Sequence, residues 1–354
     1  MKKLTIFLSL LLLSVAQAAL PCAAKPQIQP TSTQAKPMTY PLNLAIMLFE
    51  GVQIIDYTGP YETFGHAYDH GQMFNIYTVS EKGETLTTAM GMTVTPKYSF
   101  ANCPKPDVIV LPGGDVDPSL ANPTVMKWIK TQSVQAKYVM SVCNGAFFLA
   151  ESGLLDGQKA TTFYGMIDDL QKVAPKCSVV IDQRFVDNGK FMTTAGLSSG
   201  IDGALHLIEK IAGFGVAQQA ALSMEYNWQP NSGYARASFA DRHLRKVLGH
   251  QGFAIPDTTL WKVLEQKGDT TWWTKKWKVG MGSASDLLKI IDTKLAESWT
   301  KVDSKSSAER ATSTWKFTDE KGVAWSASAT TEPVQGESNT LLLTISLTGP
   351  NGSK

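Results

Sequence analysis

The first two hundred residues alternate short apolar runs with longer runs of mixed polarity. The apolar runs predict four buried strands at 42–49, 74–80, 107–111 and 137–142. The runs that follow them predict helices at 59–68, 123–131 and 144–152. Continuously apolar strands are typical of a parallel sheet that helices cover on both faces. Because strands and helices alternate, the pattern predicts a doubly wound, mostly parallel α/β sheet.

The pattern then changes twice. Asn188-Gly189 between two short strands predicts a hairpin, and helices are expected at 198–211 and 215–224. After Gly233 an amphipathic basic helix is expected near 239–248. Beyond it the pattern predicts a small α+β domain with a helix at 285–299 and strands at 277–281, 314–318, 323–331 and 340–347.

The N-terminus has the marks of a secretory signal peptide. Lys2 and Lys3 precede an apolar run, and Ala16-Gln17-Ala18 is a small-x-small cleavage site. The apolar run is shorter than the roughly 20 residues that a membrane-spanning helix needs. We therefore expect an exported protein, periplasmic or secreted, without a transmembrane segment.

These patterns predict five segments: a signal peptide at 1–18, a flexible leader at 19–40, a large α/β domain at 41–234, a helical linker at 235–269 and a small α+β domain of unknown role at 270–354. The formal net charge is only +2, so nothing in the composition favours nucleic acid as a partner. The four cysteines lack metal-ligand spacing, and no metal or other cofactor is expected.

Cys143 carries the strongest chemical signal. It lies between an apolar strand and a run of small and apolar residues that begins Asn144-Gly145-Ala146, as at a strand-to-helix elbow. A thiol at a helix N-terminus has a lowered pKa, because the free N–H groups and the helix dipole favour an anion. The sequence therefore predicts an accessible thiolate nucleophile. An inert buried cysteine is the alternative.

Two further features fall at strand ends, where α/β sheets place their chemistry. Gly113 and Gly114 follow the third strand, and with the N–H of Asn144 their N–H groups are expected to form an oxyanion hole. Asp56 follows the first strand and is expected to carry a proton or to bond the sulfur. The alternative for Asp56 is a cap on the helix expected from Gly59.

Together these motifs resemble the ThiJ/PfpI superfamily, also called class I glutamine amidotransferase-like. The resemblance covers roughly residues 42–234 and is closest to the branch that contains isonitrile hydratase and the N-terminal domains of some AraC-type regulators. Its motifs are Gly51-Val52-Gln53-Ile54-Ile55-Asp56-Tyr57-Thr58-Gly59-Pro60, Val110-Leu111-Pro112-Gly113-Gly114, Ser141-Val142-Cys143-Asn144-Gly145-Ala146 and Thr194-Ala195-Gly196-Leu197-Ser198-Ser199-Gly200-Ile201-Asp202.

The resemblance implies a flavodoxin-like sheet and a homodimer. It also implies that Cys143 adds to an isonitrile carbon, Asp56 moves a proton and water completes hydration to an N-substituted formamide. Asn144 stands where the hydratase has threonine, and Phe163 stands where the branch usually has histidine. Because Phe163 cannot take a proton, Cys–His catalysis through that position is not available.

Two functions remain open at this point. One is a cysteine-dependent hydratase acting on a small molecule, with Tyr57, Phe163 and Tyr164 as an aromatic pocket wall. The other is a non-enzymatic protein that senses a ligand or redox state through the same cysteine. Tryptophans are frequent near the C-terminus; most are expected to pack a core, and Trp272-Trp273 is the best candidate for an exposed contact.

Overall fold

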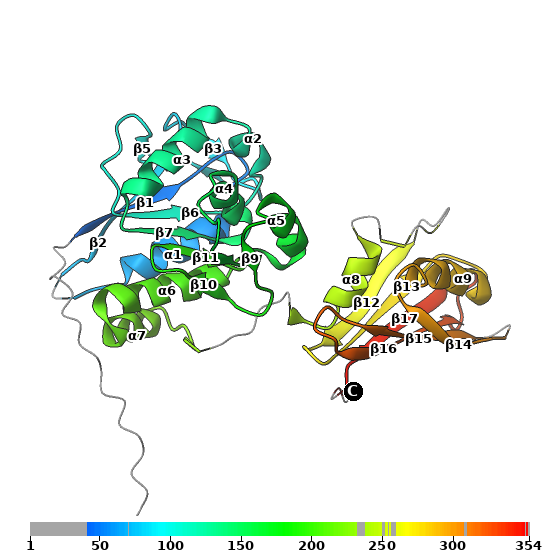
Figure 1. The fold of residues 1–354 in the computed structure, drawn as a ribbon. Helices are drawn as coiled ribbons and strands as arrows, with labels where there is room; N and C mark the ends of the chain where they lie inside the picture. Colours follow the sequence, from blue (N-terminus) through cyan, green and yellow to red (C-terminus); the bar gives the residue numbers. More distant parts are fainter. Residues whose placement is uncertain are drawn as a thin grey trace, which may run out of the picture. The chain divides into compact units, whose positions relative to one another are not determined.

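The computed structural model describes residues 41–69, 71–231, 238–249, 252–253, 255, 260–307, 310–350 and 352. Within the first of its two large sheets, seven strands lie in the order β10-β11-β7-β6-β1-β2-β5 (Figure 1). They are β1 (Leu42–Met47), β2 (Phe74–Ser80), β5 (Tyr98–Ser99), β6 (Val108–Leu111), β7 (Tyr138–Ser141), β10 (Phe185–Asp187) and β11 (Phe191–Thr194). Only β10 runs antiparallel to its neighbour in this sheet, which confirms a mostly parallel sheet.

Helices cover both faces of this sheet. On one face lie α1 (Ile54–Gly65), α6 (Ser199–Ala212) and α7 (Phe214–Ser223), which pack on one another (Figure 1). The other helices are α2 (Asp117–Leu120), α3 (Pro123–Gln135), α4 (Ala146–Glu151) and α5 (Ile167–Val173), with 3-10 turns at Cys143–Gly145 and Tyr164–Met166. Two short ladders pair β3 (Leu86–Thr87) with β4 (Thr93–Val94) and β8 (Lys159–Ala160) with β9 (Ser178–Val179). The strands β1, β6 and β7 are almost wholly buried, as their apolar sequences require.

Two expected helices differ from the sequence prediction. Helix α1 begins at Ile54, five residues before the expected start, so Asp56 lies inside its first turn and is not its cap. Pro60 lies within this helix and has no N–H to donate to the carbonyl of Asp56. The helix after Cys143 is a 3-10 turn followed by the six residues of α4, so its dipole is that of a short helix.

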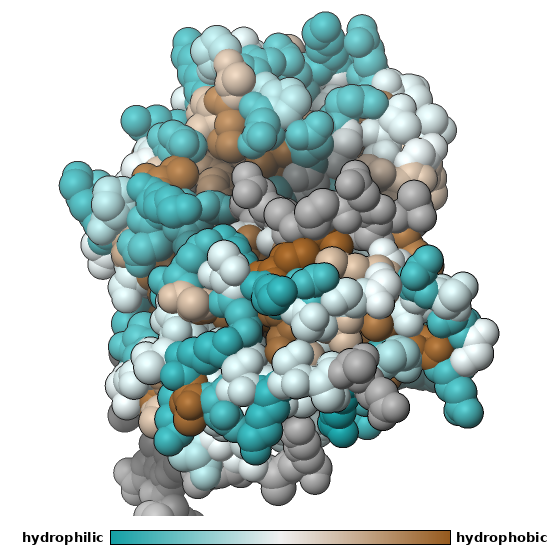
Figure 2. All heavy atoms as spheres, turned by 90° about the vertical axis from the view of Figure 1, so that its right-hand side faces the viewer, coloured by the Kyte–Doolittle hydropathy of each residue, from teal (hydrophilic) through white to brown (hydrophobic). Residues whose placement is uncertain are grey.

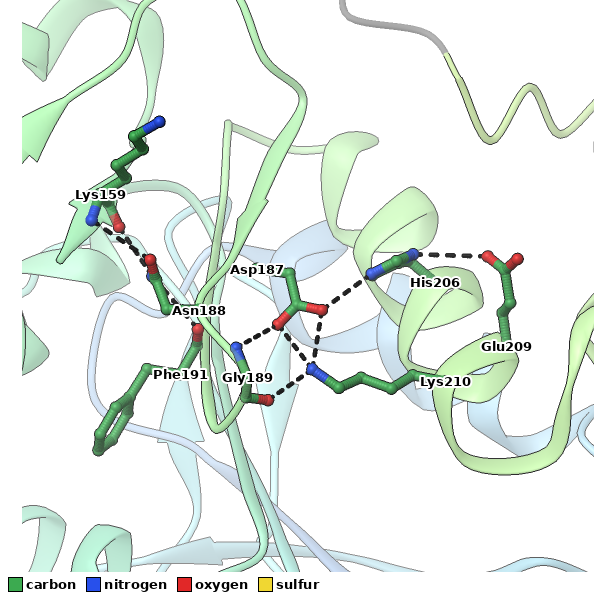
Figure 3. A network of polar contacts seen from close by, with 8 residues as sticks. All are labelled: Lys159, Asp187, Asn188, Gly189, Phe191, His206, Glu209 and Lys210. Atoms are coloured by element: carbon green, nitrogen blue, oxygen red, sulfur yellow. Dashed lines mark hydrogen bonds and ion pairs between the residues drawn. The ribbon is translucent and has the colours of Figure 1, made fainter. Parts of the chain in front are cut away.

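The β10–β11 hairpin is tied to α6 by a polar network (Figure 3). Lys210 Nζ donates to both carboxylate oxygens of Asp187, at 2.8 Å each. His206 Nε2 lies 3.1 Å from Asp187 Oδ2. Partial burial would raise the pKa of Asp187, but the bonds with His206 and Lys210 outweigh it and bring that pKa to about 2. His206 also stacks on Phe185 at 4.6 Å. His206 is thus a packed helix residue that holds the hairpin against α6.

The second sheet is antiparallel and has six strands in the order β12-β13-β17-β16-β15-β14. They are β12 (Trp261–Gly268), β13 (Trp272–Val279), β14 (Thr300–Ser306), β15 (Ala311–Thr318), β16 (Ala324–Pro333) and β17 (Leu341–Thr348). Helix α9 (Ala284–Leu295) packs on β15 and β16, and α8 (Arg242–Leu248) packs on α9. This confirms a sheet-rich α+β unit at the C-terminal end.

The sequence predicted a helical linker at 235–269, and the described residues of this stretch include both a helix, α8, and a strand. It supplies β12 to the second sheet, and Leu244 of α8 belongs to the same core as Leu343 of β17. The tryptophans of this core are Trp273, Trp277, Trp299, Trp315 and Trp325. The exposed contact expected at Trp272-Trp273 is wrong for Trp273, which is only 4% exposed.

The surface seen from the right-hand side of Figure 1 is of mixed polarity. Figure 2 shows brown apolar patches set between teal hydrophilic side chains. Among the described residues of the C-terminal sheet, the large apolar side chains that are exposed are Trp261, Val263, Leu264 and Val302. The expected signal peptide and leader, Cys22 and the exact end of the first domain lie outside the described residues. In the part of the chain that is described, no helix is both long and apolar enough to cross a membrane.

Candidate active site at the ends of four strands

Four neighbouring strands bring the candidate residues to one edge of the first sheet. Asp56 follows β1, Gly113 and Gly114 follow β6, and Cys143 follows β7. The segment after β11 reaches the same place, because the N–H of Cys143 donates to the carbonyl of Ala195 at 3.3 Å. The parallel order β11-β7-β6-β1 thus gathers residues that are up to 139 positions apart in the chain.

Cys143 occupies the strained elbow that the sequence predicted. Its φ is +58°, a left-handed backbone conformation that residues other than glycine rarely adopt. Its carbonyl accepts a hydrogen bond from Thr162 Oγ1 at 2.8 Å, and both residues are buried. A side chain at Gly145 would overlap the carbonyl oxygen of Leu111, so only glycine fits beside the cysteine. Thr162 was not singled out by the sequence reasoning.

Asp56 is fully buried beside the cysteine. Its Oδ2 accepts the N–H of Gly113 at 3.1 Å, whereas its Oδ1 has no hydrogen-bond partner of ordinary geometry. Burial raises the pKa of Asp56 from 3.8 to about 6, against the lowering effect of the Gly113 N–H and the Cys143 thiol. A carboxyl group with such a pKa gives and takes protons near neutral pH.

The surroundings of Cys143 contradict the expectation of an accessible thiolate with a low pKa. The residue is only 9% exposed. Burial, and after it the negative charge of Asp56, raise the pKa of the thiol well above its ordinary value. These effects outweigh the main-chain N–H groups of Asn144 and Leu197, which lower that pKa. At neutral pH the pair therefore holds one proton on sulfur and one negative charge on Asp56.

The expected oxyanion hole is also corrected, because its donors have other partners. The N–H of Gly113 donates to Asp56, and the N–H of Gly114 donates to Asn144 Oδ1 at 2.8 Å. Asn144 Nδ2 in turn donates to the carbonyl of Gly114 at 2.8 Å. The Asn144 side chain therefore clamps one peptide unit of the β6 loop. A Cβ at Gly113 would overlap Asn144 Oδ1 and lie 2.9 Å from both Asp56 Oδ2 and Cys143 Cβ.

Two other main-chain N–H groups influence the titration of the pair. Those of Asn144 and Leu197 both lower the pKa of Cys143, and that of Leu197 also lowers the pKa of Asp56. The Asn144 donor was expected. The Leu197 donor was missed, although its segment was recognised as a motif, because a leucine with a φ of +56° has no sequence signature.

The three expected pocket aromatics have different surroundings. Phe163 follows Thr162 and packs against Gly196, where a Cβ would come within 2.5 Å of its ring. Tyr164 lies against Phe163 with ring centroids 4.3 Å apart. Tyr57 is buried in α1, and burial raises the pKa of its hydroxyl. Phe163 is linked to the cysteine loop through its neighbour Thr162, which donates to the carbonyl of Cys143.

Among the described residues, no group of three or more His, Cys, Asp or Glu side chains is placed to hold a metal ion. Cys103, Cys143 and Cys177 are free thiols. Thus the chemistry that the arrangement offers is that of a thiol, a carboxyl group with a raised pKa and a few main-chain donors.

Comparisons with known proteins agree with this geometry. The family model described as "DJ-1/PfpI family" matches residues 43–210. Isonitrile hydratase of Pseudomonas putida is 34% identical over 186 residues, which cover 52% of this chain and 78% of the hydratase. The transcriptional regulator CdhR of Pseudomonas aeruginosa is 27% identical over 43% of this chain and 45% of the regulator.

A solved structure supports the same assignment. The crystal structure of a ThiJ/PfpI family protein from Pseudomonas syringae has a TM-score of 0.51 and 27% identity, over 63% of this chain and 90% of that one. The strand order, the cysteine elbow and the match to most of a relative's length point the same way. The chain belongs to the DJ-1/PfpI family.

Proposed function

We propose that this protein is an exported enzyme that hydrates a small isonitrile to an N-substituted formamide. The observation that carries the proposal is the buried pair of Cys143 and Asp56, in which a carboxyl group with a pKa of about 6 faces a protonated thiol. The 34% identity to an isonitrile hydratase supports this substrate class. Family membership alone does not, since regulators are also among the relatives.

The pair suits the proton movements of this reaction. As the sulfur attacks the terminal carbon of the isonitrile, its proton moves to Asp56. Asp56 then gives that proton to the same carbon, which leaves a thioimidate on Cys143. Water adds to the thioimidate carbon, the carbon–sulfur bond breaks with the proton returning to sulfur, and the product is R–NH–CHO. The atoms of one isonitrile and one water are accounted for, and no oxidant or reductant is consumed.

Export and assembly are part of the proposal. The signal-peptide pattern of residues 1–18 supports a periplasmic or secreted protein. A homodimer is proposed because it is what the family resemblance implies. Aromatic Phe163 beside the cysteine loop supports an uncharged, apolar substituent on the substrate.

The test is formamide production by the purified mature protein from cyclohexyl isocyanide, followed by NMR. We expect turnover in the parent and in Cys103→Ser, a control at a free cysteine outside the site. Cys143→Ala and Asp56→Asn should lose at least about 100-fold, the scale of general acid–base catalysis. Because Asp56 must be ionised to accept the proton, kcat/KM should rise with pH through about 6.

A ligand-binding or redox-sensing protein is the second candidate. The phenylalanine at the position where the branch usually has histidine favours it, because no Cys–His pair is available there. Two results together would favour this second candidate over the hydratase. The folded protein would give no formamide from a panel of isonitriles, and peroxide would oxidise its Cys143 reversibly.

A further inference from the structure

The strained backbone at Cys143 needs support from the residues around it. Its φ of +58° lies in the left-handed region, and such a conformation persists only where the surrounding structure holds it. The side chain that depends on it is the thiol beside Asp56. A Cβ at Gly113 would lie 2.9 Å from both Cys143 Cβ and Asp56 Oδ2. The groups that hold the elbow therefore decide where the sulfur lies relative to the carboxyl group.

Both main-chain polar groups of Cys143 are bonded to parts of the chain beyond α4. Its N–H donates to the carbonyl of Ala195 at 3.3 Å, and its carbonyl accepts the hydroxyl of Thr162 at 2.8 Å. The Ala146 N–H also turns back onto this carbonyl within the 3-10 turn. Of these three bonds, only that from Thr162 is made by a side chain.

Thr162 is itself held in place. It is fully buried, as is its neighbour Thr161. The N–H of Thr161 donates to Thr193 Oγ1 in β11 at 2.9 Å, and the carbonyl of Ala160 accepts the N–H of Val180 at 2.8 Å. The segment before Thr162 is therefore anchored to β11 and to the residue after β9. Its hydroxyl reaches the elbow from a fixed position.

The residue after Thr162 makes this main-chain bond more important. Phe163 has no polar atom in its side chain, so it offers no hydrogen bond to the thiol from the position where the branch usually has histidine. The polar link from this segment to the nucleophile runs through the carbonyl of Cys143 instead. The segment can therefore act on the sulfur by fixing the backbone that carries it.

We propose that Thr162 is a positioning residue of this site: by holding the carbonyl of Cys143, its hydroxyl keeps the elbow left-handed and keeps the sulfur against Asp56. The proposal rests on the proposed function only for its kinetic consequence, because the geometry of the pair does not depend on the substrate. Removing the hydroxyl deprives a buried carbonyl of a donor, which favours relaxation of the elbow.

Two neighbouring threonines provide a matched set of variants. Thr162→Val removes the hydroxyl and keeps the shape of the side chain, whereas Thr162→Ser keeps the hydroxyl. Thr161→Val is the control, because Thr161 is equally buried but its hydroxyl has no hydrogen-bond partner. The Ala146 N–H still serves the Cys143 carbonyl in Thr162→Val, so we expect this variant to fold. If it does not, Thr162→Ala beside Thr162→Ser repeats the comparison.

The first test follows the ¹³C resonance of the Asp56 carboxyl carbon, which is identified by its absence in Asp56→Asn. We expect a titration midpoint near 6 in the parent, Thr162→Ser and Thr161→Val. In Thr162→Val the midpoint should rise, because the thiol that lowers the pKa of Asp56 moves away from it. An unchanged midpoint in Thr162→Val would overturn the proposal, whether or not the protein hydrates isonitriles. So would an equal rise in Thr161→Val, since the hydroxyl of Thr162 would then not be the cause.

The second test measures hydration of cyclohexyl isocyanide. Thr162→Val should lower kcat about tenfold, the scale of one net hydrogen bond, and leave KM nearly unchanged, because a displaced sulfur attacks more slowly while the substrate still binds. Thr162→Ser should recover most of kcat, and Thr161→Val should match the parent. A raised KM with an unchanged kcat would assign Thr162 to substrate binding and overturn the proposal. If the parent makes no formamide, the proposed function fails, and the carboxyl titration alone decides this inference.

Discussion

At the scale of single residues, the buried carboxyl group of Asp56 carries a cost in stability. Its pKa is about 6 in the folded protein and 3.8 ordinarily, so the unfolded chain loses this proton more easily. Below pH 3.8 the group is neutral in both states and costs nothing. The cost grows as the pH rises through about 6 and is complete above it.

We therefore predict that Asp56→Asn raises the free energy of unfolding at pH 8 by up to about 3 kcal/mol, the value of a two-unit pKa difference. At pH 3.5 the two proteins should be equally stable, because neither side chain is charged. Urea denaturation at the two pH values measures the difference. The same gain at both values would show that burial of a charge is not its cause.

The residues of the site could be predicted from the sequence, but their protonation could not. Cys143, Asp56 and Gly113 each follow an apolar strand, and chain order reveals that. Their pKa values depend on how completely four strand ends exclude water, which is a property of packing. The prediction of a thiolate was wrong because it counted the helix dipole and left out burial.

At the scale of elements, the loop after β6 fits the site only because Gly113 has no side chain. A Cβ there would overlap Asn144 Oδ1 and crowd Asp56 and Cys143. Gly113→Ala should therefore lower the free energy of unfolding by about 1–3 kcal/mol, the usual cost of overpacking. Turnover should fall as well, because the Asn144 clamp on Gly114 would be displaced.

Gly215→Ala is the control for this prediction. Gly215 lies in α7, and a Cβ there meets no atom within 4 Å. This substitution should be neutral or stabilise the helix by up to about 1 kcal/mol. Thermal unfolding of both variants, with turnover beside it, makes the comparison. Equal effects would mean that the space around Gly113 is not the constraint we describe.

Apolar strands could be predicted closely, whereas exposed strands were missed. The expected strand at 74–80 coincides with β2. Every residue of β14 (Thr300–Ser306) is exposed, as is most of β12 (Trp261–Gly268), so neither has the buried face that produces a clear alternation. The start of α1 was missed because Gly59 and Pro60 resemble a helix boundary while lying inside the helix.

At the scale of the whole molecule, the second sheet has a hydrophobic core of its own. Leu343 of β17 is fully buried in it, and the core's members all come from residue 240 onward. Leu343→Ala should destabilise this sheet by about 2–5 kcal/mol. Tryptophan fluorescence follows its unfolding, because the core contains five tryptophans. The rate of Cys143 alkylation at 25 °C should be unchanged, because Cys143 belongs to the first sheet. A changed rate would contradict the inference that the second sheet has its own core.

A second, sheet-rich unit near the C-terminus could be predicted from the sequence, but the elements that belong to it could not. The change in composition after Gly233 indicates a second unit. The role of 235–269 depends in part on a contact far along the chain, since Leu244 joins the core that contains Leu343 of β17. Strand β12 pairs with its neighbour β13 as a hairpin, but its mostly exposed residues give no clear alternation. A local pattern carries no information on a contact such as that of Leu244 with the core of β17.

The clamp made by the Asn144 side chain has a consequence for chemical ageing. Asn144-Gly145 is an asparagine–glycine pair, the sequence in which the glycine nitrogen most readily attacks the asparagine side chain to form a succinimide. Here the amide is bonded at both ends to Gly114, and the Gly145 N–H is bonded to the carbonyl of Val142. The Asn188 side chain, before Gly189, is held in the same way: its Oδ1 accepts the N–H of Lys159, and its Nδ2 donates to the Lys159 carbonyl (Figure 3). Folding therefore shields both pairs, so the extent of deamidation beside Cys143 should report how long the chain has spent unfolded.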